Sequence, residues 1–129
     1  PENTPVPGVL IVRLDGGLYF ANALTVRDRV KAMIEEMQPP PSTVIFDASA
    51  QDSLDLTSSD VLKSMVKELQ GKGLVVVMAD VHAPVREFGR KTGLLDLIGE
   101  DHIFQTLDLA VQHVEATATP QPGQPLTSK

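Results

Sequence analysis

A run of hydroxyl and carboxylate side chains follows one of the most apolar segments of the chain. The apolar segment covers residues 43–47, and the polar residues 48–60 after it include the sequence Thr57-Ser58-Ser59. Added negative charge at the start of a helix is tolerated by the helix dipole and changes a recognition surface sharply. Thr57, Ser58 and Ser59 are therefore candidate phosphorylation sites, if a helix begins at this point.

The same residues allow two further interpretations. Asp55 or Thr57 can cap the following helix, and Asp60 lies three residues after Thr57, close to a capping box. Backbone N–H groups at a helix N-terminus also bind phosphate, which makes this segment a candidate nucleotide site. The candidate nucleotide-binding residues are Asp47, Asp55, Thr57, Ser58 and Ser59. Because Asp47, Asp55 and Asp60 carry negative charge, they would repel a phosphate unless a cation intervened.

The usual catalytic and metal-binding motifs are missing from the sequence. It has no Cys, and its three histidines, His82, His102 and His113, lack the spacing of a metal site. Neither a Gly-x-Ser-x-Gly elbow nor a phosphate loop that ends in Lys-Ser/Thr occurs. Gly71-Lys72-Gly73 follows a predicted helix and precedes a predicted strand, so it indicates a helix C-cap. The sequence therefore predicts no enzyme, no catalytic residue, no metal site and no required cofactor.

Composition limits the size of the fold and the classes of partner. The chain has 129 residues, of which 42% are hydrophobic, and this is enough for one compact domain. Its 11 basic and 17 acidic residues give a net charge of −6, which opposes a nucleic-acid backbone. No apolar run approaches the roughly 18 residues that span a bilayer. We therefore expect no nucleic-acid partner and no membrane-spanning segment.

Proline-rich ends flank the apolar part of the chain. We expect residues 1–7 to be a linker, residues 8–115 to form the domain, and residues 116–129 to be a disordered tail. The chain starts at Pro1 without an initiator Met or a targeting segment, which indicates a fragment of a longer protein.

Short β-branched runs alternate with segments of helical period between these ends. The expected strands are residues 9–14, 18–20, 43–47, 74–79 and 103–104. The expected helices have apolar stripes that begin at Ala23, Val61, Val85 and Leu107, and the second of them is the helix that Asp55 or Thr57 would cap. Asn22 is expected to be the N-cap of the first helix, and Gly93 is expected to end the third. This order predicts an α/β fold with a central mixed, mostly parallel sheet of about five strands and about four helices. Leu94, Leu95, Leu97 and Ile98 are expected to be core, with an exposed contact patch as the alternative.

Three local signatures within residues 8–115 resemble the STAS family, which is shared by sulfate permeases and bacterial anti-sigma-factor antagonists. Residues 17–23, Gly-Leu-Tyr-Phe-Ala-Asn-Ala, resemble the permease branch. Phe46-Asp47 followed by Leu54-Asp55-Leu56-Thr57 resembles the strand, loop and Asp-x-Ser/Thr start of the second helix in the family. Residues 92–95, Thr-Gly-Leu-Leu, followed by Ile103-Phe104, resemble the end of the third helix and the last strand.

The resemblance implies a STAS fold, most like the C-terminal cytoplasmic domain of a bacterial SulP-family sulfate or anion permease. It implies a regulatory domain at the cytoplasmic face of the inner (plasma) membrane, whose partner is the membrane domain of the parent permease. Several family members are thought to bind guanine or adenine nucleotides, so GDP, GTP or ATP is a candidate ligand.

The alternative that the resemblance leaves open is a free-standing anti-sigma-factor antagonist. In that branch, a partner kinase phosphorylates the hydroxyl two residues after the loop Asp, which corresponds to Thr57 here. The antagonists usually continue Ser-Ser-Gly-Leu, whereas this chain has Ser58 where the Gly would stand.

Overall fold

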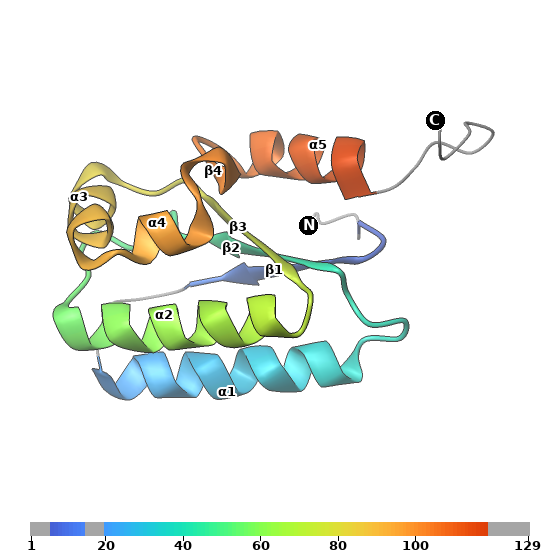
Figure 1. Cartoon of the computed structure of the whole chain (residues 1–129), viewed down its shortest axis with the longest axis horizontal. Helices are drawn as coiled ribbons and strands as arrows, with labels where there is room; N and C mark the ends of the chain where they lie inside the picture. The colour runs from blue at the N-terminus through green and yellow to red at the C-terminus, as the bar shows by residue number, and fades with distance from the viewer. Residues whose placement is uncertain (1–5, 15–19, 119–129) are drawn as a thin grey trace.

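The computed structural model describes residues 6–14 and 20–118 of the chain. Within these residues, four strands form one parallel sheet in the order β1-β2-β3-β4 (Figure 1). The strands are β1 (Val9–Arg13), β2 (Thr43–Asp47), β3 (Val75–Ala79) and β4 (Ile103–Phe104). All four coincide with expected strands, with ends that differ by no more than one residue. The α/β fold and its parallel sheet are therefore confirmed.

The helices connect the strands as parallel crossovers require. They are α1 (Phe20–Glu36), α2 (Leu56–Gly71), α3 (Ala83–Thr92), α4 (Leu94–Ile98) and α5 (Leu107–Ala118), with a 3₁₀ turn, η1 (Glu100–His102), before β4. Lys72 is the C-cap of α2, as the Gly-Lys-Gly sequence predicted. Gly93, with φ of 90°, ends α3 and starts α4. α4 is the one helix that has no counterpart among the expected elements.

Two expectations about the first helix are affected by its observed start. α1 begins at Phe20, so Asn22 lies inside the helix and is not its N-cap, contrary to the prediction. Of the strand expected over residues 18–20, Phe20 is helical and the other two residues lie outside the described part of the chain. At the other end, α5 continues to Ala118, three residues into the expected tail; residues 119–129 are outside the description.

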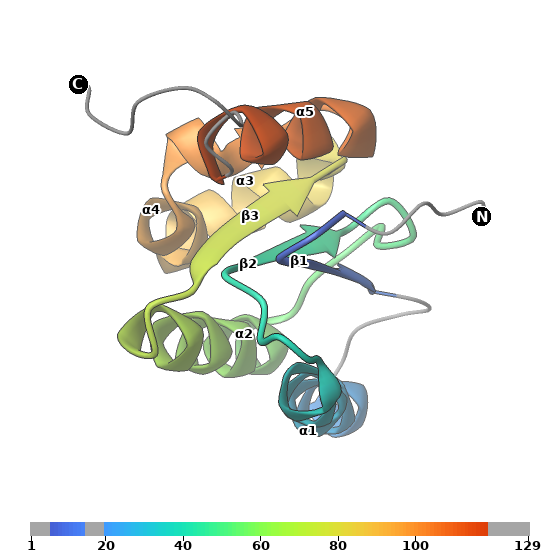
Figure 2. The same ribbon diagram turned by 90° about the vertical axis from the view of Figure 1, so that its right-hand side faces the viewer.

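The sheet separates two apolar clusters, as Figure 2 shows with α1 and α2 on one side and α5 on the other. We call the first side the packed face: there Phe46 and Met78 contact a cluster that includes Val30 of α1, Met65 of α2 and Leu94 of α4. On the opposite side, the open face, α5 is the only described helix that packs against the sheet. Its cluster contains Ile45, Val77, Ala79, Ala110 and Val114. Leu94, Leu95 and Ile98 are buried and Leu97 is half-buried, so this cluster is core rather than an exposed patch.

Candidate functional site

The start of α2 is capped by Asp55. Its Oδ1 accepts a hydrogen bond from the backbone N–H of Ser58 at 2.7 Å, and the helix begins at the next residue, Leu56. The hydrogen bond from the Ser58 backbone N–H lowers the pKa of the Asp55 carboxyl, because it favours the charged form. Of the two capping residues predicted from the sequence, Asp55 holds the position and Thr57 lies in the first turn of the helix.

The three candidate hydroxyls at this helix start differ sharply in accessibility. Thr57 is exposed, whereas Ser58 and Ser59 are each 0% exposed. They lie on the inward stripe of α2, together with Leu62 and Met65, because residues four and seven positions apart share one helix face. Thr57 is therefore the one candidate among the three that a kinase can reach in this conformation.

A chain of hydrogen bonds connects α2 to the end of α3. Ser59 Oγ lies 2.7 Å from Thr92 Oγ1, which donates to the carbonyl of Gly89 at 3.2 Å, so the Ser59 hydroxyl donates to Thr92. Lys63 Nζ donates to the carbonyl of Thr92 at 2.7 Å and so caps the last turn of α3 from a different helix. Ser59, predicted as a candidate ligand or phosphorylation site, thus has a structural contact in the fold. Sequence reasoning missed Lys63, because its partner is 29 residues away.

The loop before α2 is fixed to the ends of the strands. Asp47 is buried at the end of β2, where its Oδ1 accepts from the N–H of Ser49 at 3.0 Å. Gln51 Nε2 donates to the carbonyl of Leu14 at 2.6 Å, which ties the loop to the chain after β1. No sequence motif indicated Gln51. At the surface, His82 Nδ1 lies 3.2 Å from Asp52 Oδ1.

The five candidate nucleotide residues belong to the end of β2 and to the start of α2. Asp47, Asp55 and Ser59 already bond within the protein, whereas the buried hydroxyl of Ser58 forms no hydrogen bond with another described residue. The carboxylate of Asp55 occupies the Ser58 N–H donor that a phosphate at the helix N-terminus would use. The cavity beneath the loop, lined by Leu14, Leu54 and Val85 among others, has a volume of about 10 Å³. That volume suits one water molecule rather than a nucleotide. Among the described residues, no group of three or more His, Cys, Asp or Glu side chains is placed to hold a metal.

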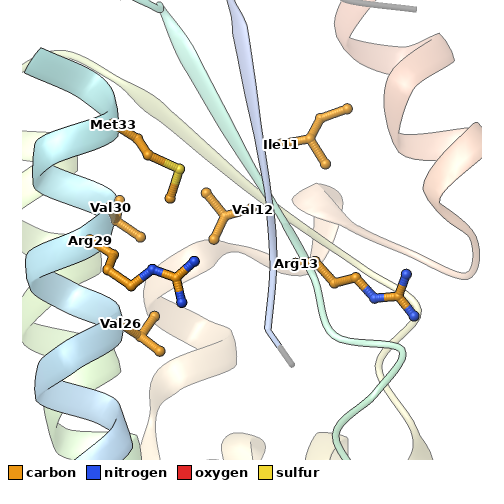
Figure 3. A pocket seen from close by; sticks show the side chains of 7 residues that line it. All are labelled: Ile11, Val12, Arg13, Val26, Arg29, Val30 and Met33. Carbon is orange, nitrogen blue, oxygen red and sulfur yellow. The ribbon is translucent and has the colours of Figure 1, made fainter. Parts of the chain in front are cut away.

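A shallow groove of about 180 Å³ lies between β1 and α1 (Figure 3). Val12 and Val30, which form its floor, belong to the core of the packed face. Figure 3 shows the guanidinium of Arg29 reaching from α1 toward β1, whereas Ile11 and Arg13 point away from α1. The groove is therefore an edge of the packed core with one cation beside it. No helix in the described residues is both long and apolar enough to cross a membrane.

Comparison with known proteins gives the family. The family model described as the STAS domain matches residues 1–110. A protein named probable sulfate transporter in Mycobacterium tuberculosis strain H37Rv is 39% identical over 112 residues, which are 87% of this chain and 20% of that protein. The chain thus spans about a fifth of the length of this relative.

Solved structures agree with the sequence match. The murine anion transporter Slc26a9 in its inward-facing state superimposes with a TM-score of 0.80 and 25% identity, over 88% of this chain and 19% of that one. The STAS domain of a SulP transporter from Vibrio cholerae has a TM-score of 0.74 and 21% identity, over 90% of this chain and 89% of that domain. Family model, sequence relative and fold all lead to the same assignment, and the chain belongs to the STAS domain family.

Proposed function

We propose that this chain is the cytoplasmic regulatory domain of a SulP-type sulfate or anion permease and acts through contacts with the membrane domain of the same polypeptide. The observation that carries the proposal is the 39% identity to one fifth of a sulfate transporter, because it places the similarity in a segment of a much longer transport protein. A non-enzymatic role fits the α2 start, where Asp47, Asp55 and Ser59 bond to the protein itself.

The first test identifies the polypeptide that contains this chain in its native cell. An antibody raised against the 129-residue chain is expected to detect a membrane-bound protein about four times as long, in line with the relative's length. Uptake of labelled sulfate should then fall when residues 6–118 are deleted, at an equal amount of transporter in the membrane. A protein of about 14 kDa in the soluble fraction would overturn the proposal and favour the antagonist alternative.

A more specific hypothesis is that the same domain binds GDP, GTP or ATP. Its support is the location of the candidate residues at the carboxyl edge of a parallel sheet, where ligands often bind. A backbone-amide NMR titration with each nucleotide, with and without magnesium, should give saturating shifts within residues 47–60. Unchanged amides in this segment at millimolar nucleotide would remove the hypothesis for the isolated domain.

The second candidate function, a free-standing anti-sigma-factor antagonist, is favoured by one observation. Thr57 is exposed in the first turn of α2, where a phosphoryl group would be accepted by the helix dipole. The expected result for an antagonist is a stoichiometric phosphate on Thr57 in the native cell, found by mass spectrometry. Absence of phosphate on Thr57 under every growth condition would argue for the permease domain.

A further inference from the structure

A cleft lies on the open face of the sheet, between α5 and the beginnings of β2 and β3. Its volume is about 460 Å³, within the range of small-molecule sites. The lining residues are Ser42, Thr43, Gly73, Val75, Val77, His102, His113, Val114 and Thr117. We call this site the α5 cleft. It lies at the opposite ends of the strands from the loop that precedes α2.

The floor of the α5 cleft is apolar and partly exposed. Val75 and Val77 point to the same side of β3, since they are two residues apart on one strand. Val77 is completely covered, whereas Val75 is 43% exposed. α5 therefore covers the middle of β3 and leaves its first residue open to a ligand.

Two imidazoles form part of the wall. The ring centroids of His102 and His113 are 6.2 Å apart, and His113 also packs on Phe104 with a centroid distance of 4.9 Å. Both histidines are half-buried, and neither ring forms a hydrogen bond with another described residue. Each neutral imidazole carries one N–H donor, so the cleft contains donors that the protein does not use.

The charge of the cleft differs from that of the rest of the domain. The described residues that line it include no carboxylate, although the chain has a net charge of −6. The start of α2, by contrast, has Asp47, Asp52, Asp55 and Asp60 nearby. An anion would meet less repulsion in the α5 cleft than at α2.

We propose that the α5 cleft binds a small organic carboxylate. The carboxylate accepts hydrogen bonds from the imidazole N–H groups of His102 and His113, and the apolar body of the ligand rests on Val75 and Val77. Charge-assisted hydrogen bonds hold the head, while burial of the ring or alkyl chain contributes the hydrophobic part. This site is independent of the permease assignment and of the nucleotide hypothesis, which concerns residues 47–60.

An NMR titration of the 129-residue chain with benzoate tests the proposal. Saturating amide shifts are expected at residues 73–77, 102 and 113, with a Kd on the order of 1 mM for so small a ligand. Benzamide, which lacks the charge, and sulfate, which lacks the apolar body, should each bind at least about tenfold more weakly. Equal binding of benzamide, shifts confined to residues 47–60, or no saturation by about 20 mM benzoate would overturn the proposal.

Two pairs of variants test the floor and the wall. Val75→Asp places a carboxylate in the cleft and should weaken benzoate binding about tenfold or more. Ile11→Asp is the matched control, because Ile11 is similarly exposed, at 38%, on the same sheet face but outside the cleft. His102→Phe removes a donor and keeps a ring, with His82→Phe as its control. Equal affinities within either pair, in variants that retain the native amide spectrum, would show that benzoate binds elsewhere.

Discussion

The two faces of the sheet differ in how completely helices cover them. On the packed face, Phe46 is 1% exposed and lies against a cluster built from four helices. On the open face, α5 is the one helix of the described chain that covers the sheet, and Ile11 is 38% and Val75 43% exposed. We infer that most of the apolar burial that stabilises the fold lies on the packed face. The open face keeps exposed apolar side chains that a ligand or partner could contact.

The packed face also determines which groups at the start of α2 are accessible. Ser58 continues the inward stripe of that helix and is fully buried, whereas the adjacent Thr57 points outward and is exposed. A kinase that acts on this helix can therefore reach Thr57 but not Ser58.

The largest expected effect is that of a charge on the packed face. Ser58→Glu would bury a carboxylate at a site with no exposure, at a cost of several kcal/mol, comparable to the whole stability of a small domain. We expect this variant to be unfolded by circular dichroism. Thr57→Glu, one residue earlier, should remain folded with a melting temperature close to that of the unmodified chain. A folded Ser58→Glu domain would contradict the packed arrangement of α2.

The next effect is loss of a large side chain from the packed face. Phe46→Ala should lower the free energy of unfolding by about 3–5 kcal/mol, since the cavity that it leaves cannot fully collapse. Ile11→Ala on the open face should cost less than about 1.5 kcal/mol, because its side chain is partly solvated already. Urea denaturation of both variants gives the comparison. If the two variants lost similar amounts of unfolding free energy, Ile11 would have to be covered in solution.

Much of the fold was predictable because the pattern that builds it is local. β-branched runs predicted every described strand, and Gly93 and the Gly-Lys-Gly sequence predicted two helix ends. The start of α1 was predicted wrongly at Asn22, because Asn is a common N-cap and Phe20 has an aromatic side chain typical of strands. The expected helix end at Gly93 gave no indication of the additional helix α4, which begins at the next residue.

The candidate site was less predictable, since its geometry depends on contacts between distant residues. The Asp55 cap follows from the local sequence. The burial of Ser58 could also have been inferred, because Ser58 lies four and seven residues before Leu62 and Met65 on one face of the helix. The hydrogen bond between Ser59 and Thr92, 33 residues apart, has no sequence signal. The cleft under α5 is another such feature, because it combines strand beginnings with one end of a helix.

A smaller effect is expected at the cap of α2, the exposed end of the packed face. Asp55→Ala should lower the melting temperature at pH 7 by about 3–5 °C, because the Ser58 N–H loses its acceptor. The folded-state pKa of Asp55 is below the ordinary value of 3.8, so its contribution is present above pH 3.8 and is lost as the pH falls through the folded pKa. The difference in melting temperature between Asp55→Ala and the unmodified chain should therefore become smaller in acid. Asp55→Asn keeps an acceptor and does not titrate, so the difference in melting temperature between Asp55→Asn and Asp55→Ala should stay constant over the same pH range.

The smallest effect is expected where a surface ion pair joins α1 to α2 outside the packed core. Lys31 Nζ lies 3.1 Å from Glu68 Oε2, and this contact with Lys31 lowers the pKa of Glu68 below its ordinary value of 4.5. The pair therefore contributes above pH 4.5 and is lost as the pH falls through the folded pKa. Because both side chains are more than a third exposed, Glu68→Gln should lower the melting temperature by less than about 2 °C at pH 7, and 1 M NaCl should remove the difference. Glu87→Gln on α3 is the matched control, as Glu87 is exposed and has no ion pair with a described residue. If Glu68→Gln cost as much as Phe46→Ala, the packed face would depend on charge pairing between its helices rather than on apolar packing.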